Sequence, residues 1–334
     1  MAWFCGVGDN AASVQLGAEL SSEFLPGTLT GPTWDRTDME ILRWDIGDAT
    51  VVRVGELDAT AALQGLIPDL DPAEVSRASW LAPHFIDEVG RLKGLVQAFV
   101  VLIAGKVIIV DPGVGNEKHR TAVPGWNDLH TDFLDRLAST GVQPGNVDYV
   151  VSTHLHFDHV GWHTRLVDGT WQPTFPAARY VMSAKEFGYW QGSPKHEIED
   201  QLAGFADSVA PIHEAGLVDL VSDDHVVIEG LRLVPSPGHT PYHVSVDIES
   251  RGQTAVITGD VMHHPCQIAY PRWGAGSDFN PDQARVSRYD LVERFAGTET
   301  LVIGSHFADP VAGHIRRDGT RFRLISAEGS ARIR

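Results

Sequence analysis

The chain has 334 residues, of which 43% are hydrophobic, and a formal net charge of -18 from 26 basic and 44 acidic side chains. Nucleic acids and anionic membrane surfaces attract lysine and arginine, so this acidic balance argues against both as partners. The length suits one large domain or two smaller ones.

The cysteines and the N-terminal residues bear on where the protein works. Cys5 and Cys266 follow neither a metal-binding nor a disulfide spacing. Residues 1–10 lack the basic and apolar regions of a signal peptide, and no apolar run is long enough to span a membrane. We therefore expect a cytoplasmic protein with reduced thiols.

The first half of the chain predicts an α/β pattern after an initial segment. Residues 1–39 are rich in Gly, Ser, Thr and Pro and are expected to form an N-terminal extension or arm. Strands are predicted over 50–54, 96–104, 106–110, 147–152 and 178–182. The third of these ends in Asp-Pro-Gly (111–113), a turn signal. Helical patterns occupy parts of 71–90, 127–140 and 195–209, and another begins at Ser183; the segment 195–209 is a candidate cap over the site.

The second half repeats this alternation. Strands are predicted over 226–228, 231–234, 244–248, 255–258 and 300–303. Asn280 caps a helix that has Pro281 in its first turn and ends before Gly297. Because no Gly- or Pro-rich linker separates the two halves, we expect residues 40–334 to form a single α/β domain of layered sheets and helices.

A cluster of ligand-type side chains follows the predicted strand over 147–152. Residues 153–159 read Thr-His-Leu-His-Phe-Asp-His. His154 and His156 point to the same side of an extended chain, because side chains alternate with a period of two. Asp158 and His159 come after a turn and face a second position. Imidazole and carboxylate groups gathered in this way are typical of a metal site.

Three later strands end in the same pattern, a small residue followed by a residue that can bind a metal ion. They lead into Pro-Gly-His239, Gly-Asp260 and Gly-Ser-His306. Small residues let the backbone turn sharply and come close to an ion. Each is compatible with an ordinary turn when taken alone. Together with the cluster they produce the order His-x-His-x-Asp-His, His, Asp, His.

This order resembles the signature of the metallo-β-lactamase superfamily, and the resemblance extends from about Ile41 to the C-terminus. It implies an αββα four-layer sandwich, in which two mixed β-sheets are flanked by helices and the site lies at one edge between the sheets. It also implies a complete ligand set for two metal ions. One ion would be bound by His154, His156 and His239, the second by Asp158, His159 and His306, with Asp260 bridging the two.

Two divalent metal ions are therefore the expected cofactors. Zinc is the first choice, although nitrogen and oxygen ligands also suit manganese, iron and cobalt. Two such ions share a hydroxide that is nucleophilic at neutral pH. We predict a dinuclear metal-dependent hydrolase that uses this metal-bridging hydroxide to open a lactone or cleave a carboxylic ester. Asp158 and Asp260 are the predicted catalytic residues, and Asp260 is a candidate for protonating the leaving group.

Within the superfamily, the runs Thr-His-Leu-His-Phe-Asp-His-Val-Gly and Gly-Ser-His-Phe look most like the branch of N-acyl-homoserine lactonases and methyl parathion hydrolase. The segment 261–273 is closer to methyl parathion hydrolase, so hydrolysis of an organophosphate or aryl phosphotriester is the alternative activity. The absence of an export signal disfavours β-lactam hydrolysis. The complete ligand set disfavours a non-catalytic metal-binding protein.

Aromatic and histidine side chains near these motifs are the candidates for holding a small apolar or aromatic ester-like substrate. The candidates are Phe157, Trp162, Tyr189, Trp190, His263, His264, Tyr270, Trp273 and Phe307. Lactonases of this kind use a tyrosine to steady the substrate carbonyl, for which the candidates are Tyr189, Tyr242 and Tyr270. The N-terminal arm is compatible with a homodimer.

Overall fold

The computed structural model describes residue 39, residues 41–123, 125–195 and 197–327, and residue 329. The predicted arm over residues 1–39 lies outside this part of the chain except for Met39, and stays a prediction. All the elements described below belong to one unit, residues 37–334.

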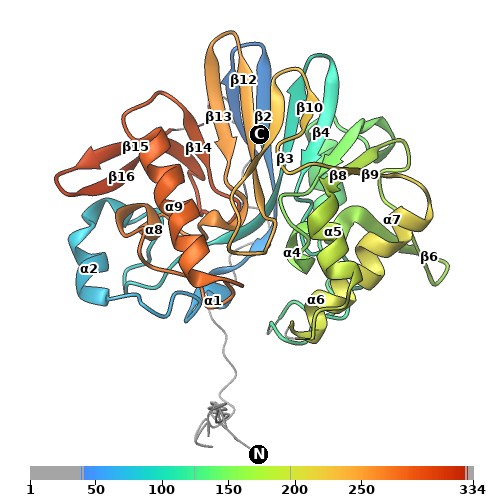
Figure 1. Ribbon diagram of the computed structural model, residues 1–334, viewed down its shortest axis with the longest axis horizontal. Helices are drawn as coiled ribbons and strands as arrows, with labels where there is room; N and C mark the ends of the chain where they lie inside the picture. Colours follow the sequence, from blue (N-terminus) through green and yellow to red (C-terminus); the bar gives the residue numbers. More distant parts are fainter. Residues whose placement is uncertain (1–38, 40, 124, 196, 328, 330–334) are drawn as a thin grey trace, which may run out of the picture. The chain divides into compact units, whose positions relative to one another are not determined.

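Two seven-stranded sheets are formed by the described residues (Figure 1). The first has the order β1-β2-β3-β4-β5-β8-β9 and consists of β1 (Leu42–Ile46), β2 (Ala49–Asp58), β3 (Leu95–Ile103), β4 (Lys106–Val110), β5 (Tyr149–Val151), β8 (Arg179–Ser183) and β9 (Val218–Val221). The second has the order β10-β11-β12-β13-β14-β15-β16 and consists of β10 (Val226–Ile228), β11 (Leu231–Pro235), β12 (Val244–Ser250), β13 (Gln253–Ile257), β14 (Leu301–Ile303), β15 (Ala312–Asp318) and β16 (Arg321–Ser326). Both are mixed, since β4, β5, β8 and β9 run parallel in the first sheet, as do β13 and β14 in the second.

Helices and short turns of helix connect these strands. Around the first sheet they are α3 (Phe133–Ser139), η2 (Pro144–Asn146), α4 (Phe157–Val160), η3 (Gly161–His163), α5 (Ala184–Gln191), α6 (Glu199–Gly204), the π-helix η4 (Phe205–Val209) and α7 (Ala210–Glu214). Around the second they are α1 (Thr60–Leu63), α2 (Pro72–Arg77), η1 (Ser79–Leu81), η5 (Gly259–Val261), α8 (Cys266–Ala269) and α9 (Pro281–Phe295). A small hairpin, β6 (Thr164–Val167) with β7 (Thr170–Pro173), lies apart from both sheets. No helix among the described residues combines the length and apolar character needed to cross a membrane.

The buried side chains sort into three layers because strand residues alternate between two faces. Val51, Phe99 and Ile108 of the first sheet share a cluster with Leu233 and Val246 of the second, so the two sheets face each other across this layer. The neighbouring positions point the opposite way. Those of the first sheet pack under α3, α5 and α7, and those of the second pack under α8 and α9. Figure 1 shows α5 and α7 beside the first sheet and α8 and α9 beside the second. The predicted αββα four-layer sandwich is confirmed.

The predicted helix over 127–140 is wrong in its first half, since α3 begins only at Phe133. Asp128 has a positive φ of 49°, which a helix interior excludes. The side-chain oxygen of Asn127 accepts a hydrogen bond from the Arg120 backbone at 2.9 Å, and Asn116 bonds the Thr131 backbone. These local bonds to a preceding loop replace the helical ones.

The predicted helix over 195–209 starts later, at Glu199, and changes into the wider π-helix at Phe205. Gly204 at this change lies against Phe157, where a Cβ would approach the Phe157 Cβ to 2.7 Å. The backbone of this segment therefore packs directly on the residue that follows His156.

Candidate metal centre

The ligand-type residues predicted from the sequence all follow the ends of strands that meet at one edge of the sandwich. His154 and His156 follow β5, and His156 leads into α4, which carries Asp158 and His159. His239, Asp260 and His306 follow β11, β13 and β14 of the second sheet. The two sheets thus contribute to one site.

Seven side chains form two groups whose ligand atoms lie within 4.8 Å of one another in each group. The first group consists of His154, His156, His239 and Asp260, and the second of Asp158, His159 and His306. All but Asp158 are buried.

Asp260 lies between the two groups. Its carboxylate oxygens are 3.4 Å from His239 Nε2 in the first group and 3.3 Å from both His159 Nε2 and His306 Nε2 in the second. One carboxylate therefore contacts ligand-type nitrogens of both groups.

Hydrogen bonds to the outer ring nitrogens determine which nitrogens of the second group are free to bind a cation. His159 Nδ1 donates to Asp111 Oδ2 at 3.0 Å, and His306 Nδ1 donates to the Leu95 carbonyl at 2.9 Å. With these protons placed by their partners, neutral His159 and His306 carry lone pairs on Nε2. These two nitrogens are 3.2 Å apart. Two lone pairs at that distance repel unless a proton or a metal cation lies near both.

The first group has the same arrangement. His239 Nδ1 contacts Asp278 Oδ1 at 3.2 Å, and its Nε2 faces His156 Nδ1 at 3.0 Å. His154 Nδ1 is 3.0 Å from the Thr153 hydroxyl, which itself donates to a carboxylate. His154 Nε2 and Asp260 Oδ1 are buried and have no hydrogen-bond partner among the described residues. Converging lone pairs and unpartnered buried acceptors are what a divalent cation would satisfy, so the donor set fits the expected metal ions.

The charge balance of the site also favours a bound cation. Burial lowers the pKa of His154 and His156, assisted by neighbouring histidines. Burial alone would raise the pKa of Asp260, but His306 and His159 outweigh it and hold that pKa well below its usual range. The same contacts raise the pKa of His159 and His306 against the effect of their burial. The carboxylates thus attract positive charge, and a metal ion competes with protons for these nitrogens.

A second layer of polar residues, which the sequence patterns did not reveal, holds the ligand-type side chains. Asp111 was predicted only as part of a turn, yet its carboxylate accepts from His159 and from the backbone and hydroxyl of Thr153. Glu186 on α5 accepts from Leu155 N, Thr240 Oγ1 and Trp190 Nε1. It therefore joins the two loops that carry His154, His156 and His239.

His243 lies beside the cluster but uses its ring for support. Its Nε2 accepts from the Asp260 backbone N–H at 2.9 Å, so its Nδ1 carries the proton and donates to Ser236 Oγ at 2.9 Å. Ser236 in turn contacts Ser245 Oγ, which donates to the Thr258 carbonyl. Burial lowers the pKa of His243 to about 3, so it is neutral at physiological pH. This chain of bonds fixes the backbone at Asp260.

Gly259 is required next to this support. It has a φ of +55°, and a Cβ there would lie 2.5 Å from His243 Nε2. Only glycine lets the strand turn into Asp260 while His243 stays in place.

The predicted substrate contacts fall into two sets. Trp190 lies 5.6 Å from the His156 ring, Tyr189 packs on Trp190, and Phe157 follows His156 directly. His263 Nε2 is 3.2 Å from Asp260 Oδ2, and its buried Nδ1 has no partner among the described residues. The second set is packed into the interior.

In that second set, polar atoms are already paired within the protein. Tyr270 stacks on Trp273 and donates to the Glu74 carbonyl. The ring nitrogens of His264 are bonded to Phe85 O and Cys266 N, and Trp162 Nε1 donates to Glu56. Phe307 is fully buried in the same core cluster as Tyr270. Their part in substrate binding stays a prediction.

The exposed aromatic Phe279 was not among the predicted candidates. It is 52% exposed, its ring lies 5.6 Å from that of Tyr189, and its N–H donates to the His239 carbonyl. Tyr189 itself donates its hydroxyl to Glu197, while Tyr242 is 37% exposed. The sequence signal for Phe279 is its place just before the cap of α9.

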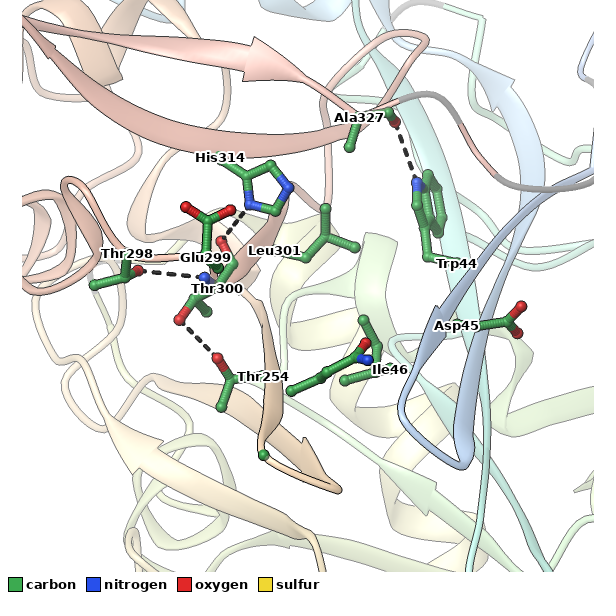
Figure 2. A pocket seen from close by; sticks show the side chains of 12 residues that line it. Trp44, Asp45, Ile46, Thr254, Thr298, Glu299, Thr300, Leu301, His314 and Ala327 are labelled. Atoms are coloured by element: carbon green, nitrogen blue, oxygen red, sulfur yellow. Dashed lines mark hydrogen bonds between the residues drawn. The ribbon is translucent and has the colours of Figure 1, made fainter.

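A separate cavity of about 570 Å³ lies at the opposite ends of β13 and β14 from the metal centre. It is lined by Thr254 and Leu301 near the starts of these strands, whereas Asp260 and His306 follow their far ends. Figure 2 shows that its polar groups bond to one another: Thr254 to Thr300, His314 to the Thr300 carbonyl, and Trp44 to the Ala327 carbonyl. These polar groups form hydrogen bonds with one another and do not point together toward a ligand.

The family model of the metallo-beta-lactamase superfamily matches residues 93–306, and the chain belongs to this superfamily. The match runs from the loop before β3 to His306 and so includes all seven ligand-type residues.

Curated relatives match over part of their length. An N-acyl homoserine lactonase of Bacillus sp is 26% identical over 125 residues, 37% of this chain and 42% of that protein. The N-acyl homoserine lactonase AttM of Agrobacterium fabrum is 30% identical over 129 residues, 36% of this chain and 43% of that protein. A probable metallo-hydrolase of Mycobacterium tuberculosis is 27% identical over 46% of this chain and 49% of its own length. The chain thus spans about half or less of these relatives.

Solved structures match over most of the chain. The hydrolase AbOPH of the beta lactamase superfamily superposes with a TM-score of 0.72 at 24% identity, covering 87% of this chain and 99% of its own. AidC, a dizinc quorum-quenching lactonase with a bound product, superposes with a TM-score of 0.69 at 18% identity, covering 86% and 98%. At these identities the likeness shows the shared fold.

Proposed function

We propose that the chain is a metal-dependent hydrolase that opens a lactone or cleaves another carboxylic ester at the two groups of His and Asp side chains. The observation that carries this proposal is the pairing of the groups through Asp260, with three of the histidines directed by outer hydrogen bonds to present Nε2 lone pairs. Membership of the superfamily supports it, as do relatives that are N-acyl homoserine lactonases.

The residues that would hold two divalent metal ions, with zinc as the first choice, are the seven of the two groups. His154, His156 and His239 would hold the first ion, Asp158, His159 and His306 the second, and Asp260 would contact both. Such ions supply Lewis-acid polarisation of the substrate carbonyl and lower the pKa of a coordinated water to about 7.

The protein's own groups position and move protons. Asp260 would accept the proton of the attacking water and pass it to the leaving oxygen; its Oδ1 is buried and has no hydrogen-bond partner among the described residues, which supports this role. His263 Nε2 lies 3.2 Å from the other oxygen of this carboxylate, Oδ2. Trp190 and Phe157 exclude water on the side of His156.

The test is a paired assay on one preparation whose metal content is measured. A series of acyl-homoserine lactones is compared with an aryl phosphotriester. We expect lactone turnover that rises with acyl chain length, and a loss of about 100-fold or more in kcat/KM for His156→Ala. His314→Ala, outside the two groups, is the matched control and should retain activity.

The other outcomes are informative. Strong phosphotriester turnover with weak lactone turnover would replace the ester proposal by the organophosphate alternative. Bound metal without turnover of either substrate would retain the site and reject the substrate class. Equal activity of His156→Ala and His314→Ala would reject the catalytic site itself.

A further inference from the structure

The strongest unassigned feature is a buried ion pair directly behind His239. Asp278 Oδ2 lies 3.3 Å from an Arg288 Nη atom, and both side chains are completely buried. Asp278 belongs to the loop before α9, whereas Arg288 lies within that helix. A buried ion pair contributes little to stability compared with an apolar pair of the same size, because both charges lose their hydration. Its presence here therefore calls for another explanation.

Each member of the pair contacts a segment that carries a ligand-type residue. Asp278 Oδ1 accepts from His239 Nδ1 at 3.2 Å, which leaves the Nε2 lone pair facing the other ligands. Arg288 Nε donates to the carbonyl of Val261, the residue after Asp260, at 2.8 Å. One ion pair is thus connected to both second-sheet members of the first ligand group.

The surrounding backbone holds the pair in place. The Ala275 N–H donates to Asp278 Oδ2 at 2.9 Å, and Arg288 Nη1 donates to the Pro271 carbonyl at 3.3 Å. The N-terminus of α9 packs tightly on the turn before His239, since a Cβ at Gly238 would lie 2.1 Å from Ala284 N. The pair and the turn therefore form one rigid support.

We propose that Asp278 and Arg288 are positioning residues for the metal centre. Asp278 fixes the ring orientation and tautomer of His239, and Arg288 fixes both that carboxylate and the backbone that follows Asp260. This inference rests on the proposed metal site but not on the identity of the ester. Partners that orient a metal-binding histidine change metal affinity by about 10- to 100-fold when they are removed.

The experiment measures zinc affinity by competition with a chromophoric chelator on the full chain, alongside metal content and thermal unfolding. Asp278→Asn keeps the shape of the side chain but replaces one acceptor oxygen by an NH₂ group, where three donors, His239 Nδ1, the Ala275 N–H and Arg288, meet the carboxylate. We expect zinc affinity to fall about 10- to 100-fold at one of the two sites. The matched control is Asp207→Asn, which removes a carboxylate that is paired with two buried cations, Arg120 and Lys118, and not with a histidine of the ligand groups. The control should lose stability and keep its zinc affinity.

A double-mutant cycle separates positioning from general support of the fold. In His239→Ala there is no imidazole for Asp278 to orient, so adding Asp278→Asn should lower zinc affinity by much less than it does in the wild type. Arg288→Lys keeps the charge but loses the forked donors to Val261 and Pro271, and we expect it to weaken zinc binding too. If Asp278→Asn does not fold, the zinc affinity of Arg288→Lys tests the same proposal.

The failures of the two proposals are distinguishable. Wild-type protein that binds no zinc would reject the proposed function. Wild-type protein that binds zinc, with Asp278→Asn equal to Asp207→Asn or with additive effects in the cycle, would overturn the positioning role alone.

Discussion

At the scale of single residues, the chemistry of the site depends on side chains that do not face it. His159, His306 and His239 each place one ring nitrogen toward the ligand groups because the other is bonded to Asp111, to the Leu95 carbonyl or to Asp278. His243 uses the same principle in reverse, since its Nε2 is occupied by the Asp260 N–H. Which ring nitrogen of a histidine is hydrogen-bonded thus decides whether the ring can offer Nε2 as a ligand or serves only to support the backbone.

Glu56 supports the loops around the candidate metal centre from further away. Its carboxylate accepts from Val114 N, Gly115 N and Trp162 Nε1, and so holds the loop that follows Asp111. Burial raises the pKa of Glu56 from 4.5 to about 7, although these hydrogen bonds act to lower it. The native state therefore binds a proton that the unfolded chain releases between about pH 4.5 and 7.

This proton makes stability depend on pH. Because the native state binds more protons than the unfolded state in that window, the free energy of unfolding should fall as the pH rises from 4.5 to 7, by up to about 3 kcal/mol through this group. Glu56→Gln should lose that dependence, whatever its effect on stability at a single pH. Chemical denaturation of chelator-treated wild type and variant across this range measures the difference. Parallel pH profiles would show that Glu56 titrates normally in the fold.

At the scale of elements, one helix joins the loops of two sheets. Glu186 on α5 receives N–H groups from Leu155, between the two histidines after β5, and from Tyr242, and a hydroxyl from Thr240, next to His239. Burial raises the pKa of Glu186, while these donors act to lower it. The carboxylate aligns a loop of the first sheet with a loop of the second.

Removal of this carboxylate should disturb both loops. Glu186→Ala leaves several buried donors without an acceptor, and each such donor costs about 1–3 kcal/mol, so we expect a loss of about 3 kcal/mol or more in the free energy of unfolding. Zinc affinity should fall in the same variant. Glu197→Gln, which changes the acceptor of the partly buried Tyr189 hydroxyl, is the control. A Glu186→Ala protein with unchanged stability would contradict the bridging role.

At the scale of the whole described unit, the candidate metal centre lies where the two sheets meet at one edge. The first sheet contributes His154, His156, Asp158 and His159, and the second contributes His239, Asp260 and His306. Apolar packing joins the sheets elsewhere in the layer between them. Bound cations would add to the hydrogen bonds that already join the sheets at this edge, such as those from the Leu95 N–H to the His306 carbonyl and from the Val244 N–H to the Thr153 carbonyl.

Metal removal should therefore lower thermal stability. Ions that bind the native state but not the unfolded chain stabilise it by about 2.7 kcal/mol per site at 100 times the dissociation constant. We expect chelation to lower Tm and added zinc to restore it, as measured by differential scanning calorimetry. His156→Ala should show a much smaller zinc-dependent shift. An equal Tm with and without the chelator would contradict a cation that joins the sheets.

The sequence by itself predicted the α/β alternation and the His and Asp side chains that the structure brings together, while resemblance to the superfamily implied the four layers. Apolar strands such as 96–104 and 244–248, and the Asn280 cap of the last helix, are local signals and are confirmed. A small residue followed by a histidine or an aspartate at the end of a strand is also a local pattern. The seven ligand-type residues could therefore be named without coordinates. The helix over 127–140 was misjudged because its first half bonds to a loop that precedes it.

Only the tertiary structure decided what surrounds those residues. Asp278 lies 39 positions from His239, Glu186 lies 54 from Thr240, and Glu56 lies 58 from Val114. No local periodicity connects such pairs, because they meet only after strands, loops and helices far apart in the sequence have packed together. The same packing brought Phe279 beside Tyr189 and carried Tyr270 into the core. Local patterns therefore name the groups of a site, while long-range packing determines which nitrogen, which carboxylate oxygen and which side chain can act in it.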